Sequence, residues 1–128
     1  MPRQKIWAGE LKSYGVDSTI IHVCGDIHPI LEDLGQTGAS CLDIDYMVDM
    51  REARIRSGLA VRGNIDPSAI MLQGTVDDVQ AAAKKLLEET HDLTGIVLGT
   101  GCDVPPPTPN ENVKMLTTSA KKYGTYLD

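Results

Sequence analysis

Residues 98–109 read LGTGCDVPPPTP, and this segment is predicted to join a buried strand to a helix. The apolar run GIVL at 95–98 predicts the strand, and the helical pattern that begins near Asn110 predicts the helix. Four prolines stiffen the connection, and Cys102 lies near its start. The segment is therefore predicted to be a rigid loop that holds one thiol in place.

A second group of ligand-type side chains ends the first predicted strand. His22 and Cys24 are two residues apart, so on a strand their side chains point to the same face. Together with Cys102 they offer two thiols and one imidazole, a donor set suited to zinc with one coordination position left open. Each motif alone is weak evidence, because a buried cysteine on a strand is common. Cys41, in the middle of a predicted strand, is interpreted as such a core residue.

Composition limits the class of protein. A chain of 128 residues predicts one domain, residues 1–128, with its own core. We expect a cytoplasmic location and no membrane partner, because no apolar run is long enough to span a bilayer and no leader pattern is present. A net charge of -6 without a basic stripe argues against nucleic acid. Three cysteines, an odd number, indicate thiols or metal ligands rather than a disulfide framework.

Strand and helix patterns alternate along the chain. After a helix at 4–15, strands are predicted at 18–24, 39–45, 59–62 and 96–99, each followed by a helix, at about 28–34, 47–56, 76–89 and 110–122. Residues 63–67, GNIDP, are predicted to be a loop. In the last helix, Val113, Leu116 and Ala120 are predicted to face inward.

This alternation predicts an α/β fold with a parallel sheet and right-handed crossovers. Four strand-helix units are half of an eight-stranded (β/α) barrel, and a doubly wound open sheet is the alternative. Polar residues and glycines follow all four strands, which favours the barrel, because its strand ends share one mouth.

Other polar residues at these strand ends are candidates for weaker roles. Asp45 is predicted to contact substrate or support the ligands, and Asn64 either caps a turn or contacts substrate. His28, directly before Pro29, is interpreted as a loop or capping residue rather than a fourth ligand.

Several segments together resemble a known family. They are HVCG at 22–25, PILEDLGQTGA at 29–39, DIDYMVDMREAR at 43–54, GNIDP at 63–67, LQGT at 72–75 and GTGCDVPPPTPNENVKML at 99–116. They are similar to the C-terminal half of the uroporphyrinogen decarboxylase superfamily, most of all to its corrinoid:coenzyme M methyltransferase branch. The resemblance implies the fifth to eighth strands of a (β/α)8 barrel, with the N-terminal half of the family fold absent from this sequence.

The resemblance also implies a chemistry. It assigns a zinc ion to His22, Cys24 and Cys102, where the metal deprotonates a small thiol such as coenzyme M. The methyl donor is then a corrinoid, such as methylcobalamin, delivered by a corrinoid protein, and no further catalytic side chain is required. A second copy of the chain, or a separate N-terminal half-barrel, is the expected partner that completes the barrel.

Two other functions remain open. The first is decarboxylation of tetrapyrrole carboxylates, as in the superfamily's other branch, which uses no metal. That branch's essential arginine and aspartate belong to the absent half, and its last-loop histidine corresponds to Thr100, so both points count against it. The second is a non-catalytic half-barrel that binds zinc or a partner.

Overall fold

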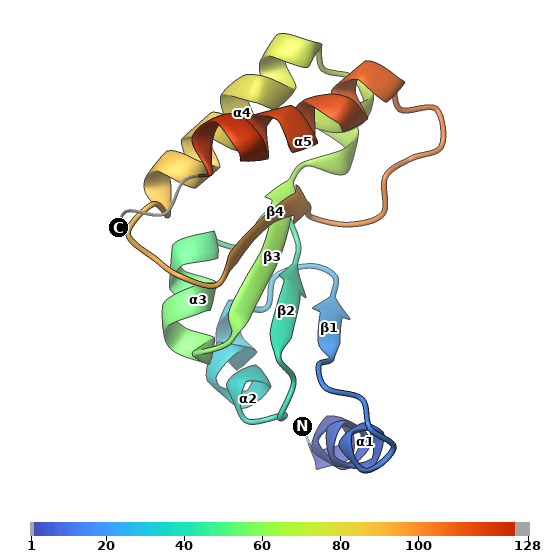
Figure 1. The fold of residues 1–128 in the computed structure, drawn as a ribbon, viewed down its shortest axis with the longest axis vertical. Coiled ribbons are helices and arrows are strands. Elements are labelled where there is room, and N and C mark those ends of the chain that lie inside the picture. The colour runs from blue at the N-terminus through green and yellow to red at the C-terminus, as the bar shows by residue number, and fades with distance from the viewer. Residues whose placement is uncertain (1, 125–128) are drawn as a thin grey trace.

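The computed structural model describes residues 2–124 and contains one parallel sheet of four strands in the order β1-β2-β3-β4 (Figure 1). The strands are β1 (Ile20–Val23), β2 (Cys41–Ile44), β3 (Ala60–Ile65) and β4 (Ile96–Thr100). The helices are α1 (Pro2–Ser13), the 3-10 turn η1 (His28–Ile30), α2 (Leu31–Gly35), α3 (Met50–Ser57), the π-helix η2 (Pro67–Leu72), α4 (Val76–Glu89) and α5 (Asn110–Tyr123). The alternation predicted from the sequence is confirmed.

Each strand pairs with the next strand along the chain, which separates this sheet from a doubly wound one, where the order reverses at a switch point. The register sets Leu42 of β2, Val61 of β3 and Ile96 of β4 side by side on one face. Side chains from α2, α3, α4 and α5 all pack against that face. The result is four consecutive strand-helix units with the helices outside, as predicted for half of a barrel.

A core of aliphatic side chains fills the space between the sheet and the helices. Leu31, Leu42, Ile44, Val61 and Val79 are almost completely buried in it. Burial of each such side chain contributes about 1.5–3 kcal/mol, so this layer fixes the strands relative to the helices. The loops at the carboxyl ends of the strands are therefore built on a rigid base.

The opposite face of the sheet, here called the open face, carries the chemistry. His22, Asp43, Arg62 and Val97 form one row across it, one residue from each strand. Successive strand residues alternate between faces, so the aliphatic residues between these positions point to the core. Val97 and, on β1, Ile20 are exposed on the open face.

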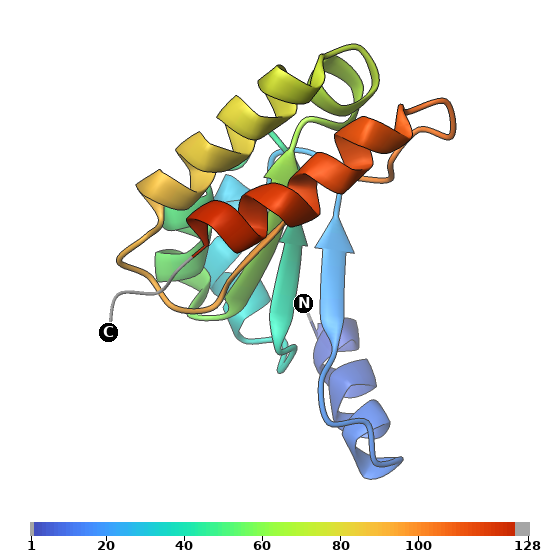
Figure 2. The same ribbon diagram turned by 45° about the horizontal axis from the view of Figure 1, so that its top comes forward.

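Helix α4 has the predicted bounds because its first turn is capped. The Thr75 hydroxyl accepts a hydrogen bond from the Asp78 backbone N–H, and the Asp78 carboxylate accepts one from the Thr75 N–H. One side of the helix faces the core, with Val79, Ala83 and Leu86 buried. Helix α5 lies beside α4 (Figures 1 and 2).

The third strand is longer than predicted, and residues 63–65 belong to it rather than to a loop. Gly63 pairs with Leu98, and the Gly63–Asn64 peptide bond is cis. A Cβ at Gly63 would lie 2.8 Å from the carbonyl oxygen of Ile44. The glycine thus permits a close approach between two strands, whereas its type alone suggested a turn.

The π-helix η2 was not predicted. Asp66 caps it, because its carboxylate accepts hydrogen bonds from the backbone N–H groups of Ser68 and Ala69. Pro67 occupies its first turn, where a missing N–H is tolerated. Similarly, Asp49 caps α3, so that helix begins at Met50 and not near residue 47.

The prediction for the inward face of α5 was wrong in part. Val113 is exposed, while Asn112 and Ser119 are buried. The Asn112 side chain donates hydrogen bonds to the carbonyl oxygens of Met71 and Gly74, and these bonds set the rotation of the helix. A buried amide with two acceptors outweighs one aliphatic contact.

The N-terminal helix α1 lies at one end of the described chain. Helix α1 keeps Ile6, Trp7 and Leu11 exposed. Over residues 2–124, no helix is both long and apolar enough to cross a membrane. The predicted domain of 1–128 includes Met1 and residues 125–128, which lie outside the described residues.

Candidate metal centre

Three donor atoms meet at the carboxyl ends of the two outer strands. The Nε2 of His22 lies 3.1 Å from the Sγ of Cys24 and 3.7 Å from the Sγ of Cys102, and the two sulfurs are 3.9 Å apart. Zinc bonds of ~2.0–2.3 Å in a tetrahedral site place ligand atoms about 3.6–3.8 Å from one another. The two distances to Cys102 are close to this spacing, and the His22–Cys24 distance is about 0.5 Å shorter. The donor types suit a zinc ion, and this is the one such group among the described residues.

The convergence brings together side chains from the two edges of the sheet. Strands β1 and β4 are its two edges, and on a flat sheet three steps of ~4.8 Å would separate them by about 14 Å. The three donor atoms nevertheless lie within 4.8 Å of one another. Cys102 is two residues beyond the end of β4, and Gly101 before it lies against the backbone of Asp45 and Tyr46, directly after β2.

Asp43 orients the imidazole of His22. Its Nδ1 lies 3.0 Å from the backbone carbonyl oxygen of Asp43 and 3.4 Å from the Oδ2 of the same residue. A proton on Nδ1 that is donated to Asp43 leaves the Nε2 lone pair directed at the two sulfurs. Outer contacts of this kind hold the ligand histidine in most metal sites.

The neighbouring thiol of Cys102 affects the ionisation of Cys24. The hydrogen bond with Cys102 and charge repulsion from it raise the pKa of Cys24, and the carboxylates of Asp45 and Asp103 add to the effect. Two adjacent thiolates repel each other, so both ionise readily only when a cation lies between them. Metal binding at this group is thus expected to release protons. In contrast, burial raises the pKa of Cys41, which lies apart from the donor group.

Hydrogen bonds connect the four strand ends around the donors. The backbone N–H of Gly25 donates to Oδ2 of Asp45 (2.7 Å), and the Asn64 amide donates to the Asp45 carbonyl oxygen (3.1 Å). The backbone N–H of Gly101 donates to the carbonyl oxygen of Ile65 (2.8 Å). The loops that carry Cys24 and Cys102 are therefore tied to the two central strands.

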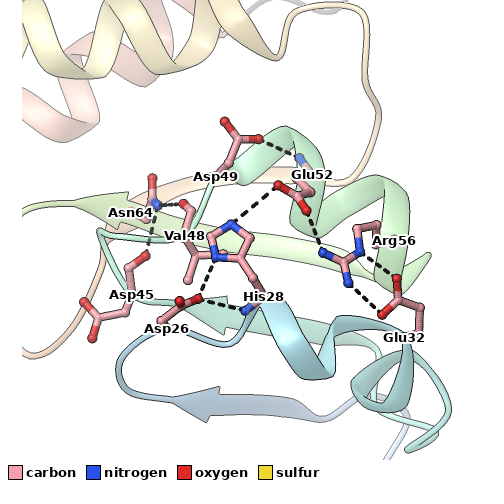
Figure 3. A network of polar contacts seen from close by, with 9 residues as sticks. All are labelled: Asp26, His28, Glu32, Asp45, Val48, Asp49, Glu52, Arg56 and Asn64. Carbon is pink, nitrogen blue, oxygen red and sulfur yellow. Dashed lines mark hydrogen bonds and ion pairs between the residues drawn. The ribbon is translucent and has the colours of Figure 1, made fainter.

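Asp45 and Asn64, predicted as substrate contacts, have structural partners in this chain. Both carboxylate oxygens of the buried Asp45 accept hydrogen bonds from backbone N–H groups, those of Gly25 and Tyr46. Asn64 also donates to the carbonyl oxygen of Val48 (Figure 3). These contacts hold the mouth of the half-barrel together, and substrate contact stays a prediction for both.

His28 lies in a separate polar network outside the donor group (Figure 3). Its Nδ1 is 2.6 Å from Oδ1 of Asp26, and its Nε2 is 3.5 Å from Oε2 of Glu52. Glu52 in turn binds Arg56, which also binds Glu32. Hydrogen bonds from the backbone and side chain of His28 lower the pKa of Asp26. The network joins the loop after β1 to α2 and α3, and so braces the segment that follows Cys24.

Arg62 is a part of the site that the sequence did not indicate. Its Nη1 lies 2.9 Å from the Oδ2 of Asp43, and it lines a cavity of about 350 Å³ together with His22 and Cys102. The position of Arg62 in the sequence could have indicated its role. It follows the apolar Val61 on a strand, so its side chain must face away from the core.

Comparisons with known proteins give relatives along nearly the whole chain. A family profile described as uroporphyrinogen decarboxylase (URO-D) matches residues 1–123. The methylcobamide:CoM methyltransferase MtbA of Methanosarcina mazei is 32% identical over 126 residues, covering 96% of this chain and 35% of MtbA. A uroporphyrinogen decarboxylase of Trichodesmium erythraeum is 30% identical over 129 residues, covering 99% of this chain and 36% of that protein.

A solved structure gives the same result in three dimensions. A methyltransferase from Methanosarcina mazei matches with a TM-score of 0.83 and 29% sequence identity, over 97% of this chain and 35% of that one. The chain thus spans about a third of the length of the relatives it matches.

Proposed function

The chain belongs to the uroporphyrinogen decarboxylase (URO-D) family, and from this premise we propose that it forms part of a zinc-dependent methyltransferase. The proposed reaction moves a methyl group from a corrinoid to a small thiol such as coenzyme M. Relatives named methylcobamide:CoM methyltransferases support this reaction. The observation that carries the proposal is the geometry of His22, Cys24 and Cys102, whose three donor atoms of zinc-ligand type lie within 4.8 Å of one another.

The residues present suit the chemistry. Zinc, when bound, supplies a positive centre that lowers the pKa of a thiol. His22, Cys24 and Cys102 would hold it, and the two cysteinates would balance its charge. In the overall reaction the sulfur–methyl bond forms, and the cobalt–methyl bond breaks with its electron pair left on cobalt. The thiol proton goes to solvent, so no further acid or base in the chain is required.

Decarboxylation is the weaker alternative. Relatives named uroporphyrinogen decarboxylase match the chain at 30% identity, so sequence similarity alone does not separate the two reactions strongly. The three-donor group favours the methyltransferase, because decarboxylation by the metal-free branch has no use for two converging thiols. A non-catalytic half-barrel that binds zinc is the remaining alternative, and an assay of methyl transfer distinguishes it.

A partner is part of the proposal. The open face carries exposed aliphatic side chains, among them Ile20 and Val97, and both edge strands can accept another strand. Further barrel strands, from a second copy or from a separate N-terminal half-barrel, would cover this face. A corrinoid protein would then deliver the methyl donor to the mouth.

Thiol binding tests the proposal without requiring turnover. Titration of the zinc-loaded chain with coenzyme M is followed by calorimetry in buffers of different ionisation enthalpy near neutral pH. We expect a buffer-dependent heat, because the thiol loses its proton on binding. Heats that are the same in all buffers would contradict thiol activation. Methyl transfer from free methylcobalamin, followed by the change in cobalt absorbance, then separates a catalyst from a metal-binding half-barrel.

A further inference from the structure

The two sulfurs of the donor group are close enough to be joined by a disulfide bond. The Sγ atoms of Cys24 and Cys102 are 3.9 Å apart, whereas a disulfide bond is about 2.0 Å long. Each sulfur must therefore move by about 1 Å, which a small rotation of each side chain provides. Cys24 directly follows β1 and Cys102 lies two residues after β4, so this movement takes place outside the strands.

The two cysteines differ in their access to solvent. Cys24 is exposed, and Cys102 is half-buried. An accessible thiolate with a second cysteine beside it is typical of a redox-sensing pair, in which one sulfur is oxidised and the other closes the disulfide. Cys41, the third cysteine, is buried and lies outside the donor group. Cys24 is thus placed to react with an oxidant, and Cys102 is placed to react with the oxidised Cys24.

Oxidation of this pair would remove ligands of the metal. Zinc is held by thiolates, and a disulfide sulfur carries no negative charge. Of the three donors, the imidazole of His22 alone would remain, and one neutral ligand holds zinc poorly. Metal binding and disulfide formation are therefore mutually exclusive states of the same two sulfurs.

We propose that Cys24 and Cys102 form a reversible redox switch, in which a peroxide converts the zinc-binding thiolates into a disulfide and so releases the metal. This inference rests on the zinc site of the proposed function and adds a means of regulating that site. The switch needs no other side chain of the protein, because the two sulfurs supply both electrons.

The reaction balances with hydrogen peroxide as the two-electron oxidant. The thiolate of Cys24 attacks one peroxide oxygen, the O–O bond breaks, and the departing hydroxide takes a proton from solvent to become water. The thiolate of Cys102 then attacks the sulfur of the Cys24 sulfenic acid, so that the S–S bond forms and the S–O bond breaks. The hydroxide that leaves also takes a proton from solvent. A dithiol reductant returns both electrons by thiol–disulfide exchange.

Peroxide treatment of the zinc-loaded chain tests the switch without requiring turnover. Hydrogen peroxide is added in the presence of a chromophoric zinc chelator, and free thiols are counted after denaturation. We expect the bound zinc to be released with the loss of two of the three thiols, and the intact mass to fall by about 2 Da. Digestion without reduction should yield the peptide that contains Cys24 linked to the one that contains Cys102. Dithiothreitol followed by zinc should restore the metal content.

Cys41→Ser is the matched control, because it removes a thiol outside the donor group, and it should give the same linked peptide as the wild type. Cys102→Ser, treated without zinc, should instead leave a sulfenic acid on Cys24 that dimedone captures. Zinc that stays bound to the oxidised chain, a disulfide that includes Cys41, or metal binding that dithiothreitol fails to restore would overturn the proposal. A reduced chain that binds no zinc overturns the proposed function as well. Zinc binding without a linked peptide overturns this proposal alone, so the two failures are distinguishable.

Discussion

Replacement of Gly101 by alanine is expected to weaken metal binding although Gly101 is not a ligand. A Cβ at this position would lie 2.4 Å from the backbone nitrogen of Tyr46 and 3.0 Å from its Cα. Comfortable non-bonded contact requires about 3.5 Å, so the two segments must separate by about 1 Å. The contacting atoms belong to the backbone, so no change of side-chain rotamer relieves the clash.

The magnitude follows from the neighbour of Gly101. Cys102 is the next residue, and metal–ligand distances tolerate only about 0.2 Å. A shift of about 1 Å therefore removes its thiolate from the position that His22 and Cys24 define. We expect zinc affinity to fall about 10- to 100-fold, the range for residues that support ligands. Overpacking should also lower the free energy of unfolding by about 1–3 kcal/mol.

Competition with a chromophoric zinc chelator measures the first effect, and urea unfolding of the zinc-free chain measures the second. Gly99→Ala is the matched control, because its Cβ would have contacts no closer than 3.4 Å. It should keep the zinc affinity of the wild type. Wild-type affinity in Gly101→Ala would refute the argument that the contact with Tyr46 positions Cys102.

Three further changes test other parts of the structure. Cys24→Ala should reduce bound zinc far below one per chain, because two protein ligands hold zinc poorly. Cys41→Ala should leave the zinc content unchanged. Equal metal content in the two variants would remove Cys24 from the site. Thr75→Ala should lower the free energy of unfolding by about 1 kcal/mol in urea, because it removes the cap of α4, and an unchanged midpoint would contradict that role. Hydrogen bonds from Arg51 lower the pKa of Asp92 to about 2 from 3.8, so this pair stabilises the fold above the unfolded pKa and stops doing so as the pH falls through the folded one. Asp92→Asn should therefore be less stable than wild type at pH 7, with the difference shrinking between about pH 4 and pH 2; a difference that persists below this range would contradict the assignment.

Local chemistry in the sequence was enough to predict most of the elements. The helical pattern predicted α4 with its observed bounds, and β1, β2 and β4 lie within two residues of their predicted bounds. The spacing of His22 and Cys24 on one strand face indicated a pair of ligand-type side chains, and the family resemblance was needed to assign them, together with Cys102, to a metal. These signals depend on residues within a turn or a few strand positions of one another, so they are visible without the fold.

The errors arose where a long-range contact outweighs local preference. Gly63 belongs to a strand because it approaches Ile44, and α5 is rotated because Asn112 binds carbonyl oxygens of the segment that precedes α4. Neither partner is close in sequence. Residue type alone therefore suggested a turn at Gly63 and an inward Val113.

The site itself required the tertiary structure. Cys24 and Cys102 are 78 residues apart, and they meet because the loop after β4 packs against the carboxyl ends of β2 and β3. The row of His22, Asp43 and Arg62 likewise depends on the register of three strands. The sequence alone determined which chemical groups are present and on which face of each strand they lie. Their distances depend on strand pairing and on the packing of the loop after β4, which arise from contacts between residues far apart in the chain.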